Sequence, residues 1–341
     1  MKKHIIIIML IPLMLMASCV QEDSFEDTPD GNFEALWKIL DEHYCFFDYK
    51  ASQYGLDWNA VYKKYSAQTS PTLSSEQLFE VLCNMLAELK DGHVNISSSY
   101  DFGRYWNWYE DYPSNYSDSI TRKYLGNDYK LASGLKYTIL DDNIGYITCE
   151  SFENSLGDGN LDQMFVHLIA CNGIIIDVRN NGGGMITSAE KLAARFFNKK
   201  TTVGYMQHKT GKGHNDFSGM EEQTITPSNG VRWQKKVAVL TNRGVYSAAN
   251  EFVKYMKCSS NVIVIGDRTG GGAGMPFSSE LPNGWSIRFS ACPMYDTDKN
   301  STEFGIAPDY TISLTTTDYM KSIDTIIEFA RKALISEPSQ E

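Results

Sequence analysis

Continuous runs of aliphatic residues recur from residue 144 onward, and segments of helical length separate them. A strand that is apolar at nearly every position is buried on both faces, as in parallel sheets that helices cover on both sides. This alternation of strand and helix predicts an α/β core in which the chemistry gathers where strands pass into helices. The predicted strands are residues 144–148, 173–178, 237–241 and 262–266, and the predicted helices are residues 161–170, 188–197 and 247–256.

The N-terminal part of the chain has a helical pattern. Between residues 32 and 89, apolar residues recur at three- and four-residue steps, as in amphipathic helices. Within this part, residues 74–77 (SSEQ) resemble a helix-start signal. We therefore predict a small helical N-terminal domain over residues 32–93 and a core over residues 94–335. The aromatic segment 105–109 either lines a substrate cleft or packs as an insertion.

Residues 1–18 have the pattern of a secretion signal. Lys2 and Lys3 precede the apolar run 5–16, which is too short for an ordinary membrane-spanning helix. We expect this segment to be a signal peptide that is removed from the mature protein.

The end of this signal, Leu15-Met16-Ala17-Ser18-Cys19, resembles a bacterial lipobox. In that interpretation Cys19 becomes the acylated first residue, and two or three acyl chains give stable membrane anchoring. Residues 19–31 are then an acidic tether. The protein is expected in the bacterial cell envelope, anchored in the outer membrane. The sequence does not decide between the periplasmic and the surface face of that membrane. The alternative is a plain secretory signal with an incidental cysteine.

Charge and cysteine content exclude several classes of function. The formal net charge of −11 repels phosphate backbones, so nucleic acid is not an expected partner. Beyond Cys19, six scattered cysteines form no CxxC motif, so neither a zinc site nor a redox motif is expected. One or two disulfides are compatible with an oxidising envelope, but the sequence does not give their pairing. No metal or organic cofactor is implied.

Three successive glycines, 182–184, follow the predicted strand 173–178. Glycines let the backbone turn sharply and present free N–H groups, which can hold a phosphate or stabilise an oxyanion. The run is neither a GxGxxG motif nor a phosphate loop. Its chemistry therefore stays ambiguous when it is taken alone.

Ser247 opens the predicted helix that follows the strand 237–241. A serine at this place sits in the positive field of a helix N-terminus, which favours anionic charge that develops nearby. The amide of Ala248 points to the same spot. By residue type alone, however, a helix N-cap is the better explanation of Ser247.

Several motifs in a fixed order make the assignment more specific. In this order the chain resembles the peptidase core of the tail-specific (C-terminal-processing) protease family, over about residues 89–310. The resemblance implies a crotonase-like or ClpP-like α/β spiral fold and serine peptidase activity. The motifs are DVRNNGGG (177–184), TNRGVYSAANEF (241–252), GDRTGGG (266–272), LPNG (281–284) and EFGIAPD (303–309).

Two departures place the chain in one branch of that family. Many members use a Ser-Lys dyad, but residues 270–274 contain no lysine where that lysine stands. Those members also carry a PDZ domain, and the stretch between His93 and residue 144 is too short for one. The chain therefore resembles the branch typified by the tricorn core protease, which uses serine, histidine and glutamate.

The resemblance to this branch implies the roles of three residues. Ser247 is the nucleophile, and His93 is the general base that takes its proton. Glu303 orients the imidazole and stabilises the imidazolium, directly or through a bridging polar group. Among the six histidines, only His93 has a motif around it, LKDGH.

Other residues are expected to assist. The amides of Gly183 or Gly184 and of Ala248 receive the oxyanion. The polar side chains expected to support the site without performing chemistry are those of Asp91, Asp177 and Arg179.

The expected substrates are peptides or unfolded protein ends, and the oligomeric state stays open. An α/β-hydrolase esterase requires GxSxG and a metallopeptidase requires HExxH, and both motifs are absent from the sequence. The remaining alternative is a catalytically inactive protein of the same fold that binds peptides or a hydrophobic ligand.

Overall fold

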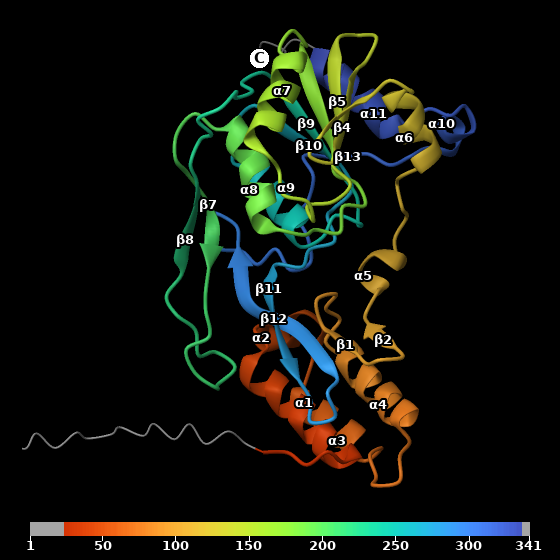
Figure 1. Ribbon diagram of the computed structural model, residues 1–341, viewed down its shortest axis with the longest axis vertical. Coiled ribbons are helices and arrows are strands. Elements are labelled where there is room, and N and C mark those ends of the chain that lie inside the picture. The colour runs from red at the N-terminus through yellow and green to blue at the C-terminus, as the bar shows by residue number, and fades with distance from the viewer. Residues whose placement is uncertain (1–23, 336–341) are drawn as a thin grey trace, which may run out of the picture.

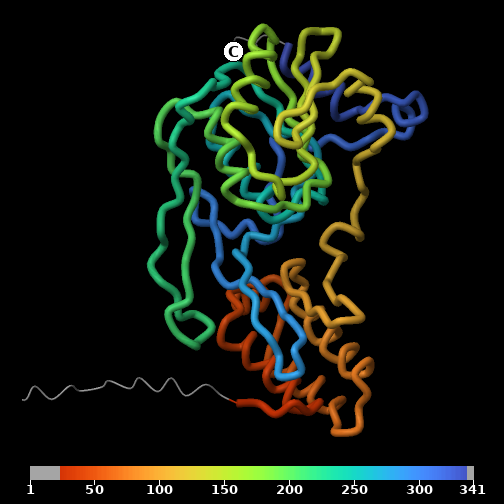
Figure 2. The backbone as a smooth tube through the Cα atoms, in the orientation of Figure 1, coloured from red at the N-terminus to blue at the C-terminus, as the bar shows by residue number. Residues whose placement is uncertain are grey.

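A computed structural model describes residues 24–335. The expected signal peptide, Cys19 and the start of the acidic tether lie outside the described residues. The chain forms two lobes along its long axis, as Figures 1 and 2 show. Among the described residues, no helix has the length and apolarity needed to cross a membrane.

The first lobe, here called the sheet lobe, is built on a seven-stranded sheet in the order β13-β10-β9-β6-β5-β4-β3. Its five central and edge strands from β13 to β5 run parallel, whereas β4 and β3 join antiparallel. The strands are β3 (Lys130–Ala132), β4 (Leu135–Ile139), β5 (Ile144–Thr148), β6 (Gly173–Asp177), β9 (Val237–Thr241), β10 (Val262–Gly266) and β13 (Tyr310–Thr311).

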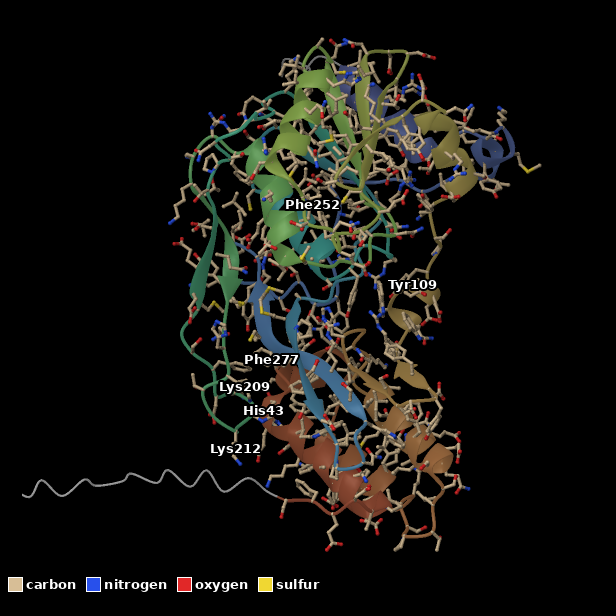
Figure 3. The ribbon with its side chains drawn as sticks, in the orientation of Figure 1. His43, Tyr109, Lys209, Lys212, Phe252 and Phe277 are labelled. Carbon is tan, nitrogen blue, oxygen red and sulfur yellow. The ribbon has the colours of Figure 1, made fainter. Side chains whose placement is uncertain are left out.

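Helices cover both faces of this sheet (Figure 1). Alternate residues of one strand show the division, because Ile174 and Ile176 pack in one apolar cluster and Ile175 in another. The first cluster includes side chains of α7 (Asp158–Leu168), α8 (Ile186–Ala193) and α9 (Ala248–Lys257), with Phe252 of α9 inside the lobe in Figure 3. The second includes α6 (Asp118–Leu125) and α11 (Thr325–Ile335). Two short helices, α5 (Asn107–Glu110) and α10 (Thr316–Met320), and a 3-10 turn (Ala194–Phe196) also occur after the N-terminal helices.

The second lobe, here called the helical lobe, contains the N-terminal helices. The expected start of α4 is present, because the Ser74 hydroxyl accepts from the Gln77 amide and the Gln77 side chain accepts from the Ser74 amide. The α/β core and the helical N-terminal region that the sequence predicts are thus confirmed. The helices are α1 (Pro29–His43), α2 (Phe47–Tyr54), α3 (Trp58–Ser66) and α4 (Ser75–Ala87).

The helical lobe also contains strands from distant parts of the chain. Its apolar cluster includes Trp285, Ile287 and Phe289 together with the N-terminal helices, so this cluster crosses the boundary predicted at residue 93. The LPNG segment (281–284) forms the turn between β11 and β12. The second sheet has the order β2-β1-β12-β7-β8, with β11 paired to β12. Its strands are β1 (Asn95–Ser97), β2 (Phe102–Arg104), β7 (Thr201–Met206), β8 (Glu221–Ile225), β11 (Gly274–Glu280) and β12 (Ser286–Tyr295).

The hairpin formed by β7 and β8 runs along one side of both lobes (Figure 1). Its tip reaches α1, where Lys212 lies 2.9 Å from Glu42 and His214 lies 2.8 Å from Asp41. Figure 3 shows Lys209 and Lys212 at this tip, next to the helical lobe. The lobes are therefore joined at their edges as well as through β11 and β12.

Candidate active site

Ser247 lies where the turn after β9 enters α9. Its backbone has φ 56° and ψ −125°, a conformation that costs a non-glycine residue about 1–3 kcal/mol. The amide of Ser247 donates to the carbonyl of Gly271 at 2.9 Å, which helps to hold this turn. The side chain makes no capping hydrogen bond to the helix, so the N-cap explanation of this serine is not supported.

His93 faces this serine from the segment between α4 and β1. Its Nε2 atom lies 2.9 Å from Ser247 Oγ, although the two residues are 154 positions apart in the chain. The imidazole is buried, and burial lowers its pKa to about 4 in spite of the opposing charge of Asp91. His93 is therefore neutral near pH 7 and able to accept a proton from the serine.

Asp91 fixes the backbone at His93. One carboxylate oxygen accepts the His93 amide at 2.7 Å, and the other accepts the hydroxyls of Tyr44 at 3.0 Å and Ser290 at 2.8 Å. Burial raises the pKa of Asp91, but the Lys50 ammonium and these hydrogen bonds together hold it below its usual value. Asp91 is thus a buried carboxylate that positions the segment carrying the imidazole.

Glu303 lies in the same buried region but does not contact the imidazole. One of its oxygens is 2.8 Å from Lys50 Nζ, and the other accepts the Ala273 amide at 3.0 Å. His93 Nδ1 is buried without a hydrogen-bond partner among residues 24–335, so a direct bond from His93 to Glu303 is not observed. Burial raises the pKa of Glu303 to about 7, although Lys50 favours its charged form.

Lys50 is the site residue that the sequence did not single out. It comes from α2 in the helical lobe, its side chain is fully buried, and it also donates to the Lys90 carbonyl at 3.2 Å. A lysine in the middle of a short helix looks like any solvated surface residue in the sequence. Lys50 becomes a buried ion-pair partner only because the fold brings Glu303, from the other end of the chain, next to it.

The glycine run forms the other side of the nucleophile. Gly183 has φ +107° and Gly184 has φ +133°, which other residues rarely adopt. A Cβ atom on Gly183 would lie 2.7 Å from Ser247 Cβ, and one on Gly184 would lie 2.3 Å from the Phe152 backbone. Both positions therefore require glycine, and they bring this backbone against Ser247.

The amides of this run are used differently. The Gly183 amide donates to Asn181 Oδ1 at 2.9 Å, so it is already satisfied. Gly184 pairs with Phe152 through two neighbouring hydrogen bonds: the Phe152 amide donates to the Gly183 carbonyl, and the Met185 amide donates to the Phe152 carbonyl. The Gly184 amide takes no part in this pairing. Asn181, which lies within the DVRNNGGG motif, is thus a second functional position whose part the sequence did not reveal.

Asp177 and Arg179 lie away from the nucleophile and the imidazole. Two oxygens of Asp177 accept from the Arg179 guanidinium at 2.9 and 2.6 Å, and Tyr146 donates to the same carboxylate at 2.9 Å. Arg179 also reaches Asp324 at 2.9 Å, which accepts the first amides of α11. This network ties the end of β6 to α11.

A cleft of about 500 Å³ contains both Ser247 and His93. An adjoining hollow of about 550 Å³ shares Arg104 and Gly182 with it and is lined by the aromatic segment 105–109. Tyr109 is partly exposed on the segment that joins the lobes, as Figure 3 shows. Of the two alternatives for this segment, lining a cleft agrees with the structure.

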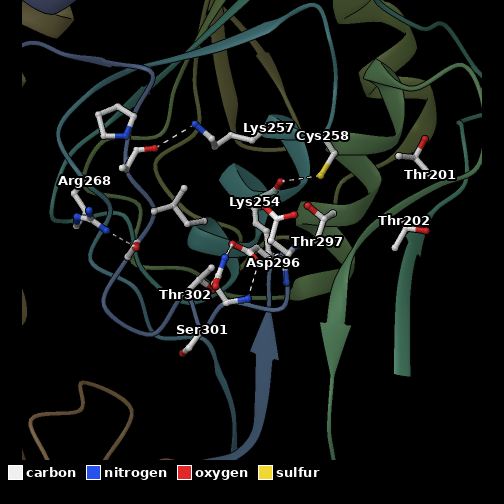
Figure 4. Close-up of a pocket in the computed structure, with 16 residues that line it drawn as sticks. Thr201, Thr202, Lys254, Lys257, Cys258, Arg268, Asp296, Thr297, Ser301 and Thr302 are labelled. Carbon is white, nitrogen blue, oxygen red and sulfur yellow. Dashed lines mark hydrogen bonds between the residues drawn. The ribbon is translucent and has the colours of Figure 1, made fainter. Parts of the chain in front are cut away.

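A larger hollow of about 720 Å³ lies beside α9 and the loop after β12 (Figure 4). Its lining includes Lys254, Lys257, Arg268 and Asp296, but neither Ser247 nor His93. Size alone would favour this hollow as the site. The pairing of a nucleophilic side chain with a neutral imidazole occurs in the smaller cleft, which we regard as the candidate active site.

Comparison with known proteins gives the same assignment. Residues 143–312 match peptidase family S41, and residues 25–87 match the tricorn protease C1 domain. A Staphylococcus epidermidis protein named "Probable CtpA-like serine protease" is 30% identical over 175 residues, which cover 50% of this chain and 34% of that protein. The chain therefore spans about a third of the length of the curated relatives that it matches.

Solved structures extend the likeness to nearly the whole chain. The crystal structure of a candidate peptidase from Parabacteroides merdae is 50% identical, with a TM-score of 0.87, and the match covers 93% of this chain and 99% of that one. Mature CPAF in complex with lactacystin is 11% identical with a TM-score of 0.71, covering 90% and 97%. This second likeness shows a shared fold.

We predict that the buried pair Lys50–Glu303 is strongly coupled. Lys50→Met leaves Glu303 buried without its cation, so the free energy of unfolding in urea should fall by about 3–5 kcal/mol. The double variant Lys50→Met/Glu303→Gln should recover part of this loss, because the buried charge of Glu303 is removed, while Asp91 still lacks the nearby ammonium. Lys64→Met, which breaks an exposed pair with Glu88, should have little effect. Additive losses in the double variant would contradict the coupling.

Proposed function

The chain belongs to peptidase family S41 and is a serine peptidase, and on this basis we propose that Ser247, His93 and Glu303 carry its catalysis. The observation that carries the proposal is the 2.9 Å contact between His93 Nε2 and Ser247 Oγ inside the cleft. The reaction is hydrolysis of a peptide bond through an acyl-enzyme.

Ser247 Oγ attacks the scissile carbonyl carbon while His93 Nε2 takes the hydroxyl proton. The same imidazole then gives this proton to the leaving amine, and water hydrolyses the acyl-enzyme by the reverse proton path. The lowered pKa of His93 supports this role, because the imidazole is unprotonated at neutral pH.

The oxyanion that forms on the carbonyl oxygen is received by the amides of Gly184 and Ala248. Ala248 is the first residue of α9, where backbone N–H groups have no partner within the helix. Gly183 is also expected from the sequence to donate to the oxyanion, but its amide already donates to Asn181. Its role is steric, because the absence of a side chain leaves room for Ser247. Backbone donors of this kind contribute about 3–4 kcal/mol to the transition state in other serine peptidases.

Glu303 acts on His93 through its charge, since His93 Nδ1 has no hydrogen-bond partner among residues 24–335. Its carboxylate lies in the same buried cluster as Asp91 and Lys50, where its negative charge stabilises a developing imidazolium. Asp91 positions the His93 backbone, whereas Asp177 and Arg179 support the site through the end of β6.

The substrates are extended peptides or unfolded protein ends, cut within or near the C-terminus. The cleft and the adjoining aromatic hollow together offer an extended path for a chain, which supports this proposal. The curated relatives are named CtpA-like serine proteases, and the chain covers only about a third of each, so its own substrates are inferred from its own cleft.

We predict that Ser247→Ala and His93→Ala each lower kcat/KM for a quenched peptide by at least about 10,000-fold, because both steps need nucleophile and base. Matched controls are Ser119→Ala and His167→Ala, which change exposed side chains of α6 and α7. A phosphonofluoridate probe should label Ser247 in the unmodified chain, as read by mass spectrometry. A folded chain that neither cuts nor labels would favour the inactive binding protein.

We predict a pH profile with two acidic steps. Catalysis needs a charged Glu303 and a neutral His93, so log kcat/KM should fall with slope 1 as the pH drops through about 7, and more steeply below about 4. Glu303→Gln should remove only the upper step. A profile of the unmodified chain with one step near 4 would show that the Glu303 charge is not required.

For the cell, we propose that the protein is a lipoprotein of the bacterial envelope, anchored in the outer membrane through acylated Cys19 after removal of residues 1–18. The support is the sequence Leu15-Met16-Ala17-Ser18-Cys19 and the acidic stretch that follows it.

We predict that Cys19→Ala abolishes labelling of the protein by a radioactive fatty acid and moves it from the membrane pellet to the soluble fraction. Cys83→Ala is the control for loss of an unrelated thiol, because Cys83 belongs to α4 in the folded part. Unchanged labelling of Cys19→Ala would refute the anchor.

A further inference from the structure

Two arginines and one asparagine form a row across the sheet of the helical lobe, next to the nucleophile. Asn95 of β1 is paired with Arg104 of β2 on one side and with Arg288 of β12 on the other. Directly opposed residues of antiparallel strands place their side chains on the same face. All three residues line the cleft that contains His93 and Ser247.

Neither guanidinium has an anionic partner in the described part of the chain. No ion pair of Arg104 or Arg288 occurs among residues 24–335, and the Nε atom of Arg104 is buried without a hydrogen-bond acceptor. Arg288 is exposed to the cleft. The Arg104 guanidinium also lies over the Trp106 ring, 4.5 Å from its centroid. Two guanidinium groups without an anionic partner on one face are a ready site for a planar anion such as a carboxylate.

The charges of the two arginines affect the pKa values of neighbouring groups. Burial lowers the pKa of Arg104, and the charge of Arg288 adds to this effect. Both guanidinium groups also favour the neutral form of His93. A bound anion between them would relieve this mutual repulsion.

The side of the cleft that belongs to the sheet lobe has the other sign. Glu150 and Glu153, from the loop after β5, line it, and Glu150 is held by Lys136 at 2.6 Å. Neither acid is paired with Arg104 or Arg288 among the described ion pairs. The cleft is therefore polarised, with its cationic wall on the side from which His93 comes.

We propose that Arg104 and Arg288 form a subsite for a carboxylate on the C-terminal side of the scissile bond. This inference rests on the proposed function, in which His93 protonates the leaving amine and so marks the leaving-group side. The arginines and His93 come from the helical lobe, whereas Glu150 and Glu153 come from the sheet lobe. The peptidase then prefers substrates with a negative charge shortly after the cut.

Two sources can supply this carboxylate, an acidic side chain or the free C-terminus of the substrate. A matched set of quenched peptides separates them. The reference has neutral residues and an amidated C-terminus, the second has the same residues with a free C-terminus, and the third is amidated with one Glu after the cut. Mass spectrometry of the products gives the cleavage position in each.

The full chain should cut at least one of the two carboxylate peptides about tenfold faster, in kcat/KM, than the reference, as expected for a hydrogen bond to a charged group. The faster peptide identifies the source. Arg288→Gln should reduce this ratio to within about threefold of 1. Arg288→Glu, at the same exposed position, should reverse the preference toward a peptide with Lys in place of Glu.

The control is Arg268→Gln, which removes an exposed arginine from the hollow of Figure 4 and should leave the ratio unchanged. Equal rates on all peptides, or an unchanged ratio in folded Arg288→Gln and Arg288→Glu, would overturn the subsite while leaving the peptidase assignment intact. Failure of the unmodified chain to cut or to react with the phosphonofluoridate probe would instead refute the proposed function.

Discussion

The ion pair between Lys50 and Glu303 joins two parts of the chain that are 253 positions apart, and the arrangement of the site depends on it. Both side chains are almost fully buried, at 0% and 2% exposure. Removing either charge would leave the other without compensation in a medium that solvates it poorly. Lys50 belongs to the helical lobe, and Glu303 follows the strand that returns to the sheet lobe. The pair therefore fixes the relative position of the segments that bring His93 to Ser247.

A second constraint is the crowded backbone around Ser247. The serine adopts a positive φ, which is unfavourable for a residue with a side chain. The backbone of Gly183 lies so close to Ser247 that position 183 has no room for a side chain. Backbone hydrogen bonds to Gly271 and Asn181 hold this geometry on both sides of the turn. The local strain is thus offset by contacts from three separate loops. The result is a hydroxyl that points to the imidazole instead of capping its helix.

The cleft combines this centre with walls of different character. An aromatic hollow extends it on the side of α5, and two arginines and two glutamates line the cleft itself. Peptide backbones are neutral along their length, so a polarised cleft distinguishes substrates chiefly by their charged side chains and termini. The charged residues of the cleft and the pair of Ser247 and His93 come from different elements.

Much of the site could be read from motifs, because the residues in them are fixed by local geometry. Three of the predicted strands match the structure at both ends, since continuous aliphatic runs are typical of buried parallel strands. Ser247 and the glycines stand at strand-to-helix turns, and at Gly183 and Gly184 only glycine fits for steric reasons. Lys50, by contrast, lies within a helical pattern and belongs to no motif that would single it out in the sequence. Whether a helical lysine faces water or a carboxylate depends on what packs against the helix.

The sequence by itself determined the strands of the core and the turns that carry the glycines, and its resemblance to a known family singled out Ser247 and His93 as the proposed nucleophile and base. The tertiary structure decided how these parts are connected. It placed Glu303 on Lys50 instead of on His93, engaged the Gly183 amide with Asn181, and completed the helical lobe with β11 and β12. It also set Arg104 and Arg288 on either side of Asn95. Each of these contacts joins residues whose pairing is set by strand register and long-range packing, and no local pattern in the chain encodes which distant partner a buried group meets.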